Sequence, residues 1–105
     1  EEGYTLDSNT GLNFGLALEA LKKGHRIART GWNGKGMFLF LLTGGTVPKT
    51  AIHDPKLREV IDSKTEGDTF EALPTIRMWT ADNKVLTGWL ASQTDMLSED
   101  WEILG

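Results

Sequence analysis

The sequence predicts an α+β protein, with an antiparallel sheet of about five strands, two main helices and a short C-terminal helix. Three observations support this class. Apolar residues recur at helical spacing over 14–23, the run at 37–42 has the length of a buried strand, and turn-forming segments at 31–36 and 81–84 each separate two strand-like segments. At 105 residues the chain has the length of one domain, 1–105.

The first helix is predicted over 14–23 by a stripe of apolar residues and by signals at both ends. Asn13 is a typical N-cap, and Lys22 and Lys23 suit the negative end of the helix dipole. Gly24 then suits the position after the last helical residue. The preceding residues 1–12 are polar and weakly patterned, so we expect a short edge strand or a flexible arm there.

The next segment predicts a strand, a turn and a second strand. Residues 25–30 form a short strand, 31–36 a turn and 37–42 a buried strand, and Asn33-Gly34 is a strong hairpin signal. Met37 to Phe40 is apolar on both faces. That pattern fits either a central core strand or a sheet covered on both sides, by a helix or a partner.

A second helix is predicted after a loop at 43–53. Asp54 provides the cap and Pro55 the first helical residue, and the helix should end near Ser63. Its apolar face consists of Leu57, Val60 and Ile61. Residues 64–74 are predicted to be a polar connector, and the whole stretch 43–74 to hold an insertion.

The C-terminal third predicts a hairpin, a short helix and a last strand. Strands at 75–80 and 85–90 flank the turn 81–84. Ser92 followed three residues later by Asp95 resembles a capping box, so a short helix should start at Gln93. Residues 101–104 should form the last strand.

Composition excludes several classes of protein. The net charge of −4 argues against a nucleic-acid polymer as partner, because such proteins neutralise phosphates with a broad basic face. A small anion needs only two or three cations, for which Lys35, Arg29, Arg77 and Lys84 are candidates. The chain has no cysteine, which suits a reducing cytosol, and no apolar run near the ~20 residues of a membrane span.

Catalytic and metal sites have weak support. No serine lies in a nucleophile elbow, and nothing in the spacing of His25 and His53 requires a metal site. Asp95 and Glu99 share a helix face and could act as an acid–base pair, although a cap and a solvated side chain explain them more simply. The glycines of 31–36 match no phosphate-binding motif.

Aromatic side chains beside polar groups are the most informative feature. Trp32, Asn33 and Lys35 bring a stacking surface, an amide and a charge to one turn. Residues 92–95 bring hydroxyls, an amide and a carboxylate to a helix start, with Trp89 just before them. If these two segments meet, they form a polar pocket with aromatic walls that suits a nucleotide-like ligand.

Three blocks carry a resemblance to a known family: 13–41, 76–95 and 96–104. Their W-N-G-K-G-M and W-L-A-S-Q-T-D-M-L-x-E-D-W strings resemble the Thoeris anti-defence 2-like family of phage and prophage proteins. The resemblance implies a single domain that is not an enzyme and needs no cofactor. It also implies sequestration of cyclic ADP-ribose-like signalling nucleotides, notably glycocyclic ADP-ribose, and in some relatives cyclic dinucleotides.

The resemblance further implies homotetramers with ligand pockets shared between subunits, acting in the cytoplasm of the bacterial host. Carried onto this sequence, it assigns ligand binding to the following residues: Trp32, Asn33, Lys35, Met78, Trp79, Trp89, Ser92, Gln93, Thr94 and Asp95. Departures at the N-terminal residues and at 43–74 leave the ligand open. The alternatives are an inhibitor module that docks on a bacterial defence protein, and a hydrolase of the same nucleotide using Asp95 and Glu99.

Overall fold

The computed structural model describes residues 9–105. The chain divides into two compact units, which we describe separately: a sheet unit of residues 9–42 and 75–105, and a hairpin unit of residues 43–74. Within the described residues, no helix combines the length and the apolar character needed to cross a membrane.

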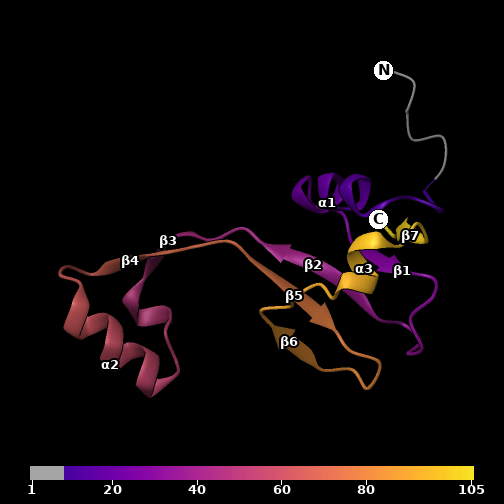
Figure 1. Ribbon diagram of the computed structural model, residues 1–105. Helices are drawn as coiled ribbons and strands as arrows, with labels where there is room; N and C mark the ends of the chain where they lie inside the picture. Colours follow the sequence, from indigo (N-terminus) through magenta and orange to yellow (C-terminus); the bar gives the residue numbers. More distant parts are fainter. Residues whose placement is uncertain (1–8) are drawn as a thin grey trace. The chain divides into compact units, whose positions relative to one another are not determined.

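The sheet unit is built on a five-stranded antiparallel sheet of order β6-β5-β2-β1-β7 (Figure 1). Its strands are β1 (Ile27–Arg29), β2 (Phe38–Leu42), β5 (Thr75–Trp79), β6 (Val85–Thr87) and β7 (Trp101–Ile103). The predicted α+β class and the sheet of about five strands are therefore confirmed. Because β2 lies at the centre of the sheet, Leu39 is fully buried in the core.

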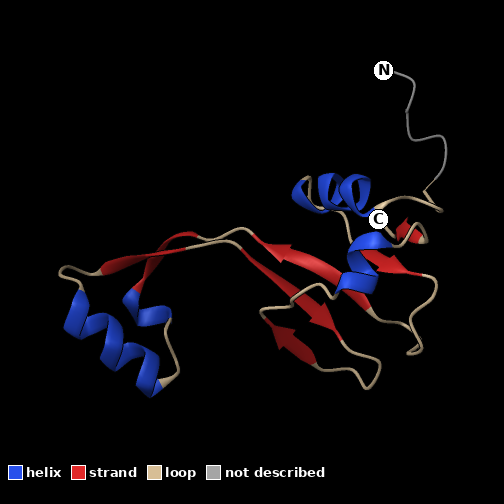
Figure 2. Ribbon diagram, in the orientation of Figure 1, coloured by secondary structure: helices blue, strands red, loops and turns tan. Residues whose placement is uncertain are grey.

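Helix α1 (Phe14–Lys22) covers one face of this sheet, which we call the inner face (Figure 2). The side chain of Asn13 caps it by accepting the Leu16 N–H at 2.8 Å. Its buried residues pack with Ile27, Leu39, Met78 and Trp101 of the sheet; they are Ala17, Ala20 and Leu21. The predicted helix is confirmed, although it ends at Lys22, with Lys23 as its C-cap.

Strand alternation sends the neighbouring side chains to the opposite, outer face. Phe38 pairs with Trp79 in the register of β2 and β5, and their rings stack with centroids 6.4 Å apart. The Arg26 guanidinium lies over the Phe38 ring at 5.0 Å from its centroid. The outer face thus presents an aromatic surface with a cation on it.

The two predicted turns of the sheet unit differ in outcome. Asn83 has a φ of 64°, and the N–H of Thr80 donates to the carbonyl of Lys84 at 2.8 Å, which confirms the turn at 81–84. The prediction of a tight turn at Asn33-Gly34 is wrong, because such a turn needs a positive φ at both residues and neither residue has one. The connection from β1 to β2 is a longer loop of residues 30–37.

Gly34 nevertheless has a structural role in this loop. A Cβ atom added there would lie 2.8 Å from the Cβ of Ala81 and would also clash with the Met37 sulfur. The loop therefore packs tightly against the 81–84 turn, and only glycine permits this approach.

The C-terminal segment follows the prediction closely. Helix α3 (Gln93–Leu97) begins at a complete capping box, with the Asp95 N–H donating to Ser92 Oγ at 3.0 Å and the Ser92 N–H donating to Asp95 Oδ2 at 3.1 Å. Of the predicted N-terminal arm, residues 1–8 lie outside the described part. Leu12 is buried and exchanges two backbone hydrogen bonds with Trp101.

The hairpin unit corrects the prediction for 43–74. Strands β3 (Gly45–Pro48) and β4 (Thr69–Ala72) form an antiparallel pair where a loop and a polar connector were expected. Both expectations are wrong because the two strands are short and mostly exposed, with only Val47 half-buried in β3 and Phe70 and Ala72 half-buried in β4, so their sequence resembles a loop. A 3₁₀ turn (Lys49–Ala51) and helix α2 (Pro55–Lys64) connect them, and the predicted helix is confirmed with Asp54 as its cap.

Candidate functional site

A cluster of three tryptophans anchors the inner face of the sheet unit. Trp101 is fully buried, and its indole N–H donates to the backbone carbonyl of Asp95 at 2.9 Å. Trp32 and Trp89 pack edge-on against it, with ring centroids 5.5 Å and 6.4 Å from that of Trp101. These contacts fix the 30–37 loop and the start of α3 against one another.

The two segments predicted to form a pocket meet directly in one chain. The Trp32 indole N–H donates to Asp95 Oδ1 at 3.2 Å, and the rings of Trp32 and Trp89 lie 6.4 Å apart. The contact joins residues 63 positions apart in the sequence. It brings the W-N-G segment beside the capping box of α3.

Arg29 connects Asp95 with a second carboxylate on the approach to β7. Its Nη1 donates to Asp95 Oδ1 at 2.8 Å and its Nε donates to Asp100 Oδ1 at 2.8 Å. Asp100 Oδ2 in turn accepts the backbone N–H of Gly31 at 2.8 Å. We call Arg29, Asp95 and Asp100 the ion triad.

The ion triad lies mostly out of water. The side chains of Arg29, Asp95 and Asp100 are 13%, 12% and 29% exposed. Burial raises the pKa of Asp95, but hydrogen bonds from Arg29, Ser92 and Trp32 together lower it below the ordinary 3.8. The hydrogen bond from Arg29 lowers the pKa of Asp100, and the Arg29 pKa is raised by its bonds to Asp100 and Asp95. Both carboxylates therefore stay ionised at neutral pH.

A groove of about 630 Å³ opens where the 30–37 loop borders the outer face of the sheet. Ala28, Phe38 and Glu102 line it from the strands, and Arg26 and Leu104 lie beside them. The loop contributes a mixed edge made of Arg29, Thr30, Trp32, Asn33, Gly34, Lys35, Gly36 and Met37. The groove combines aromatic surface, two exposed cations, an amide and a carboxylate.

The predicted site residues fall into three groups. Trp32, Asn33 and Lys35 line the groove, and Trp79 stacks on Phe38 of its wall without lining it. Met78 lies in the core, on the inner face. The remaining residues belong to the start of α3 or pack beside it, and they are Trp89, Ser92, Gln93, Thr94 and Asp95.

Within the third group the side chains differ in what they can contact. Gln93 and Thr94 are exposed on the first turn of α3. Ser92 and Asp95 satisfy one another through the capping box, and Asp95 is only 8% exposed. None of the third group lines the groove.

Four residues at the site were not predicted from the sequence to take part in it. Arg26, Phe38 and Glu102 share the outer face, and the period-two alternation of the strands could have indicated this. Asp100 carried no local signal, because its partners in β1 and in the loop after it lie 71 and 69 positions away in the sequence. Of the four candidate cations, Lys35 lines the groove and Arg29 does so while committed to the ion triad.

Arg77 stands on the outer face in the register of Phe40. Its Nε is buried and has no hydrogen-bond partner within residues 9–105. Lys84, the last candidate, forms an exposed ion pair with Asp82 at 3.2 Å.

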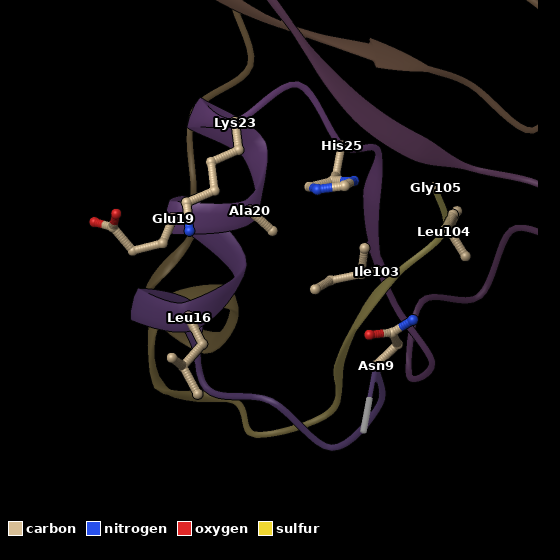
Figure 3. A pocket seen from close by; sticks show the side chains of 9 residues that line it. All are labelled: Asn9, Leu16, Glu19, Ala20, Lys23, His25, Ile103, Leu104 and Gly105. Carbon is tan, nitrogen blue, oxygen red and sulfur yellow. The ribbon is translucent and has the colours of Figure 1, made fainter. Parts of the chain in front are cut away.

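A second cavity, of about 470 Å³, lies between α1 and the end of β7 (Figure 3). Leu16, Ala20 and Ile103 supply its apolar surface, and Lys23 and His25 stand at its rim. It contains no residue predicted to bind ligand. Within residues 9–105 there is no group of three or more histidines and carboxylates that could hold a metal ion.

The fold and site define a small α+β domain in which the 30–37 loop borders an aromatic groove on an antiparallel sheet. Residues 12–104 match the model of the Thoeris anti-defense 2-like domain. The chain is also 38% identical over 102 residues to Thoeris anti-defense 2 of Bacillus phage SP01, covering 90% of this chain and 97% of that protein. The chain therefore belongs to the Thoeris anti-defense 2-like family, which confirms the resemblance noted from the three sequence blocks.

Proposed function

We propose that this protein is an anti-defence protein that captures cyclic nucleotide immune signals of the glycocyclic ADP-ribose type, so that a bacterial defence effector stays inactive. Family membership supports the anti-defence role. The observation that carries the nucleotide proposal is the groove, whose edge combines Trp32, Asn33 and Lys35.

The groove offers each kind of contact that such a ligand needs. Phe38 and Trp32 supply aromatic faces, and stacking of a base on an aromatic ring contributes about 1–3 kcal/mol. Arg26 and Lys35 supply cations for a pyrophosphate. Glu102 can accept hydrogen bonds from ribose hydroxyls.

We further propose that the protein works as a homotetramer in which copies share the ligand pockets. Capture with a nanomolar Kd requires a binding free energy of about 12 kcal/mol, which stacking in an open groove does not supply. A second copy against the groove would add walls and exclude water, and symmetric assembly is the common way to obtain them. The same enlarged pocket would accommodate cyclic dinucleotides as a second ligand class.

Sequestration, rather than turnover, agrees with the state of Asp95. A hydrolase would need its carboxylate as a free base or acid, but the lowered pKa of Asp95 and its three hydrogen bonds leave it ionised and occupied. We therefore propose a protein without enzymatic activity or cofactor, acting in the cytoplasm of the bacterial host.

A capture-and-release experiment tests the proposal. The protein is mixed with glycocyclic ADP-ribose, free ligand is removed by filtration, and the retained protein is heat-denatured. We expect intact nucleotide in the supernatant. A cleaved product would instead indicate the hydrolase, and failure to deplete the ligand would favour an inhibitor module that docks on a defence protein.

A pair of lysine variants sharpens the experiment. Lys35→Ala removes a cation from the groove edge, whereas Lys22→Ala removes an exposed lysine from α1. We expect capture to weaken about tenfold in Lys35→Ala, from loss of one charged contact, and to stay unchanged in Lys22→Ala. Equal capture by the two variants would mean that the groove is not the binding site.

A further inference from the structure

The carboxylate of Asp95 has little capacity left for a ligand. Its Oδ1 accepts hydrogen bonds from Arg29 and from the Trp32 indole, and its Oδ2 accepts the Ser92 N–H. The residue is 8% exposed and does not line the groove. Three of the roughly four acceptor positions of the carboxylate are thus occupied within the protein.

Asp100 holds the other side of the same loop. It binds Arg29 Nε through Oδ1 and the Gly31 N–H through Oδ2, at 2.8 Å each. The two residues flank the stretch that leads into Trp32, whose own N–H donates to the Arg29 carbonyl at 3.3 Å. The loop is thus attached at its backbone and at its indole ring.

Gly31 shows how close this attachment is. A Cβ at this position would lie 2.5 Å from Asp100 Oδ2 and 3.2 Å from Arg29 Nη2. The carboxylate therefore occupies the space where any other residue would carry a side chain. The ion triad and the loop fit one another only through a glycine here.

We infer that the ion triad is a positioning device: Arg29, Asp95 and Asp100 hold the Trp32 ring in the orientation in which it forms the edge of the groove, and Asp95 acts through Trp32 rather than on the ligand. This inference rests on the proposed function for its consequence in binding. Its structural content, the restraint of Trp32, can be measured without any ligand.

The test uses Asp100→Asn, because Asp100 does not line the groove and can affect binding only through its partners, Arg29 and Gly31. An amide cannot accept hydrogen bonds through both of its terminal atoms, so either the Arg29 Nε–H or the Gly31 N–H loses its acceptor. Arg29→Lys serves as a second variant, since an ammonium cannot reproduce the guanidinium fork that joins two carboxylates. The matched control is Asp62→Asn, which removes a carboxylate paired with Arg58 in the hairpin unit.

The readout is hydrogen exchange of the indole N–H groups, followed by NMR. We expect exchange of the Trp32 indole to be about tenfold faster in Asp100→Asn and Arg29→Lys, the factor that corresponds to loss of one charged hydrogen bond. The fully buried Trp101 indole is the internal control and should keep its rate, as should both indoles in Asp62→Asn.

Binding of glycocyclic ADP-ribose, measured on the same samples by calorimetry, should weaken about tenfold in the two ion-triad variants only. Unchanged exchange at Trp32 would overturn the inference, and so would faster exchange with undiminished affinity. If the wild-type protein binds no nucleotide, the proposed function fails, while the exchange rates still decide whether the ion triad restrains Trp32.

Discussion

The two units of this protein each use an arginine to join a carboxylate to a neighbouring segment, but in different surroundings. In the sheet unit, Arg29 and Asp95 form an ion pair whose side chains are 13% and 12% exposed. In the hairpin unit, Arg58 bonds Asp62 and the Lys49 carbonyl, and its ion pair has side chains 43% and 47% exposed. The same chemistry should therefore restrain structure strongly in one unit and weakly in the other.

Helices α1 and α2 differ in the same direction, because α1 is the more deeply buried of the two. Helix α1 buries Ala17, Ala20 and Leu21 against the sheet. Helix α2 buries no residue, and its Leu57 and Val60 are 48% and 46% exposed. Stability should therefore concentrate in the sheet unit, where the groove lies, because burial of apolar surface is the main stabilising contribution.

The largest expected difference in the free energy of unfolding is between two substitutions of arginine by alanine. Arg29→Ala leaves Asp95 and Asp100 with uncompensated, mostly buried charge, so the free energy of unfolding should fall by about 3–5 kcal/mol. Arg58→Ala removes a partly exposed pair and should cost about 1 kcal/mol or less.

Urea unfolding measures both effects. All four tryptophans lie in the sheet unit, so their fluorescence reports that unit, and far-ultraviolet circular dichroism reports both units. Equal losses for the two variants would contradict the comparison between buried and exposed arginines.

Two glycine substitutions give a smaller contrast. Gly31→Ala places a methyl group against Asp100 and should destabilise the sheet unit by about 2–3 kcal/mol, from overpacking and a weakened hydrogen bond. Gly67→Ala, with φ of +86° and no atom within 4 Å of its added Cβ, should cost only the backbone strain of about 1–2 kcal/mol. Thermal unfolding of the two variants ranks them, and a more stable Gly31→Ala would show that Asp100 does not occupy this space.

The smallest effect expected is a dependence of folding stability on acid pH. The pKa values of Asp95 and Asp100 lie below 3.8 in the folded protein, so the folded state binds fewer protons than the unfolded state near that pH. Their contribution to stability is complete above pH 3.8 and is lost as the pH falls through the lowered folded values. Urea unfolding at a series of acid pH values should show a loss that is shallower in Asp100→Asn; identical slopes would rule out this role for Asp100.

Local patterns predicted much of the fold because they concern residues that contact one another within a few positions. The cap at Asn13, the turn around Asn83 and the box of Ser92 and Asp95 are all interactions over four residues or fewer. Strands β3 and β4 escaped prediction because they are short and half-exposed, so that no alternation stood out from the polar background. Asn33-Gly34 was misinterpreted because Gly34 serves a close approach to Ala81 and not a turn geometry.

The site was predictable only as far as its residue types were unusual. Trp32, Asn33 and Lys35 stood out as stacking and polar groups in one turn, and they share the groove edge. The partners that hold them there come from the other end of the chain: the contact from Arg29 to Asp100 spans 71 positions. A contact between residues so far apart in the sequence follows from the topology, which places β1 beside β7. The pattern of a single sequence does not contain this information.

The most direct test of the account is an NMR titration of the labelled protein with glycocyclic ADP-ribose. We expect the largest shift changes at Trp32, Asn33 and Lys35, with the signals of α2 unchanged. Saturable changes confined to the cavity between α1 and β7, or to the hairpin unit, would contradict the central claim that the groove beside the 30–37 loop receives the nucleotide.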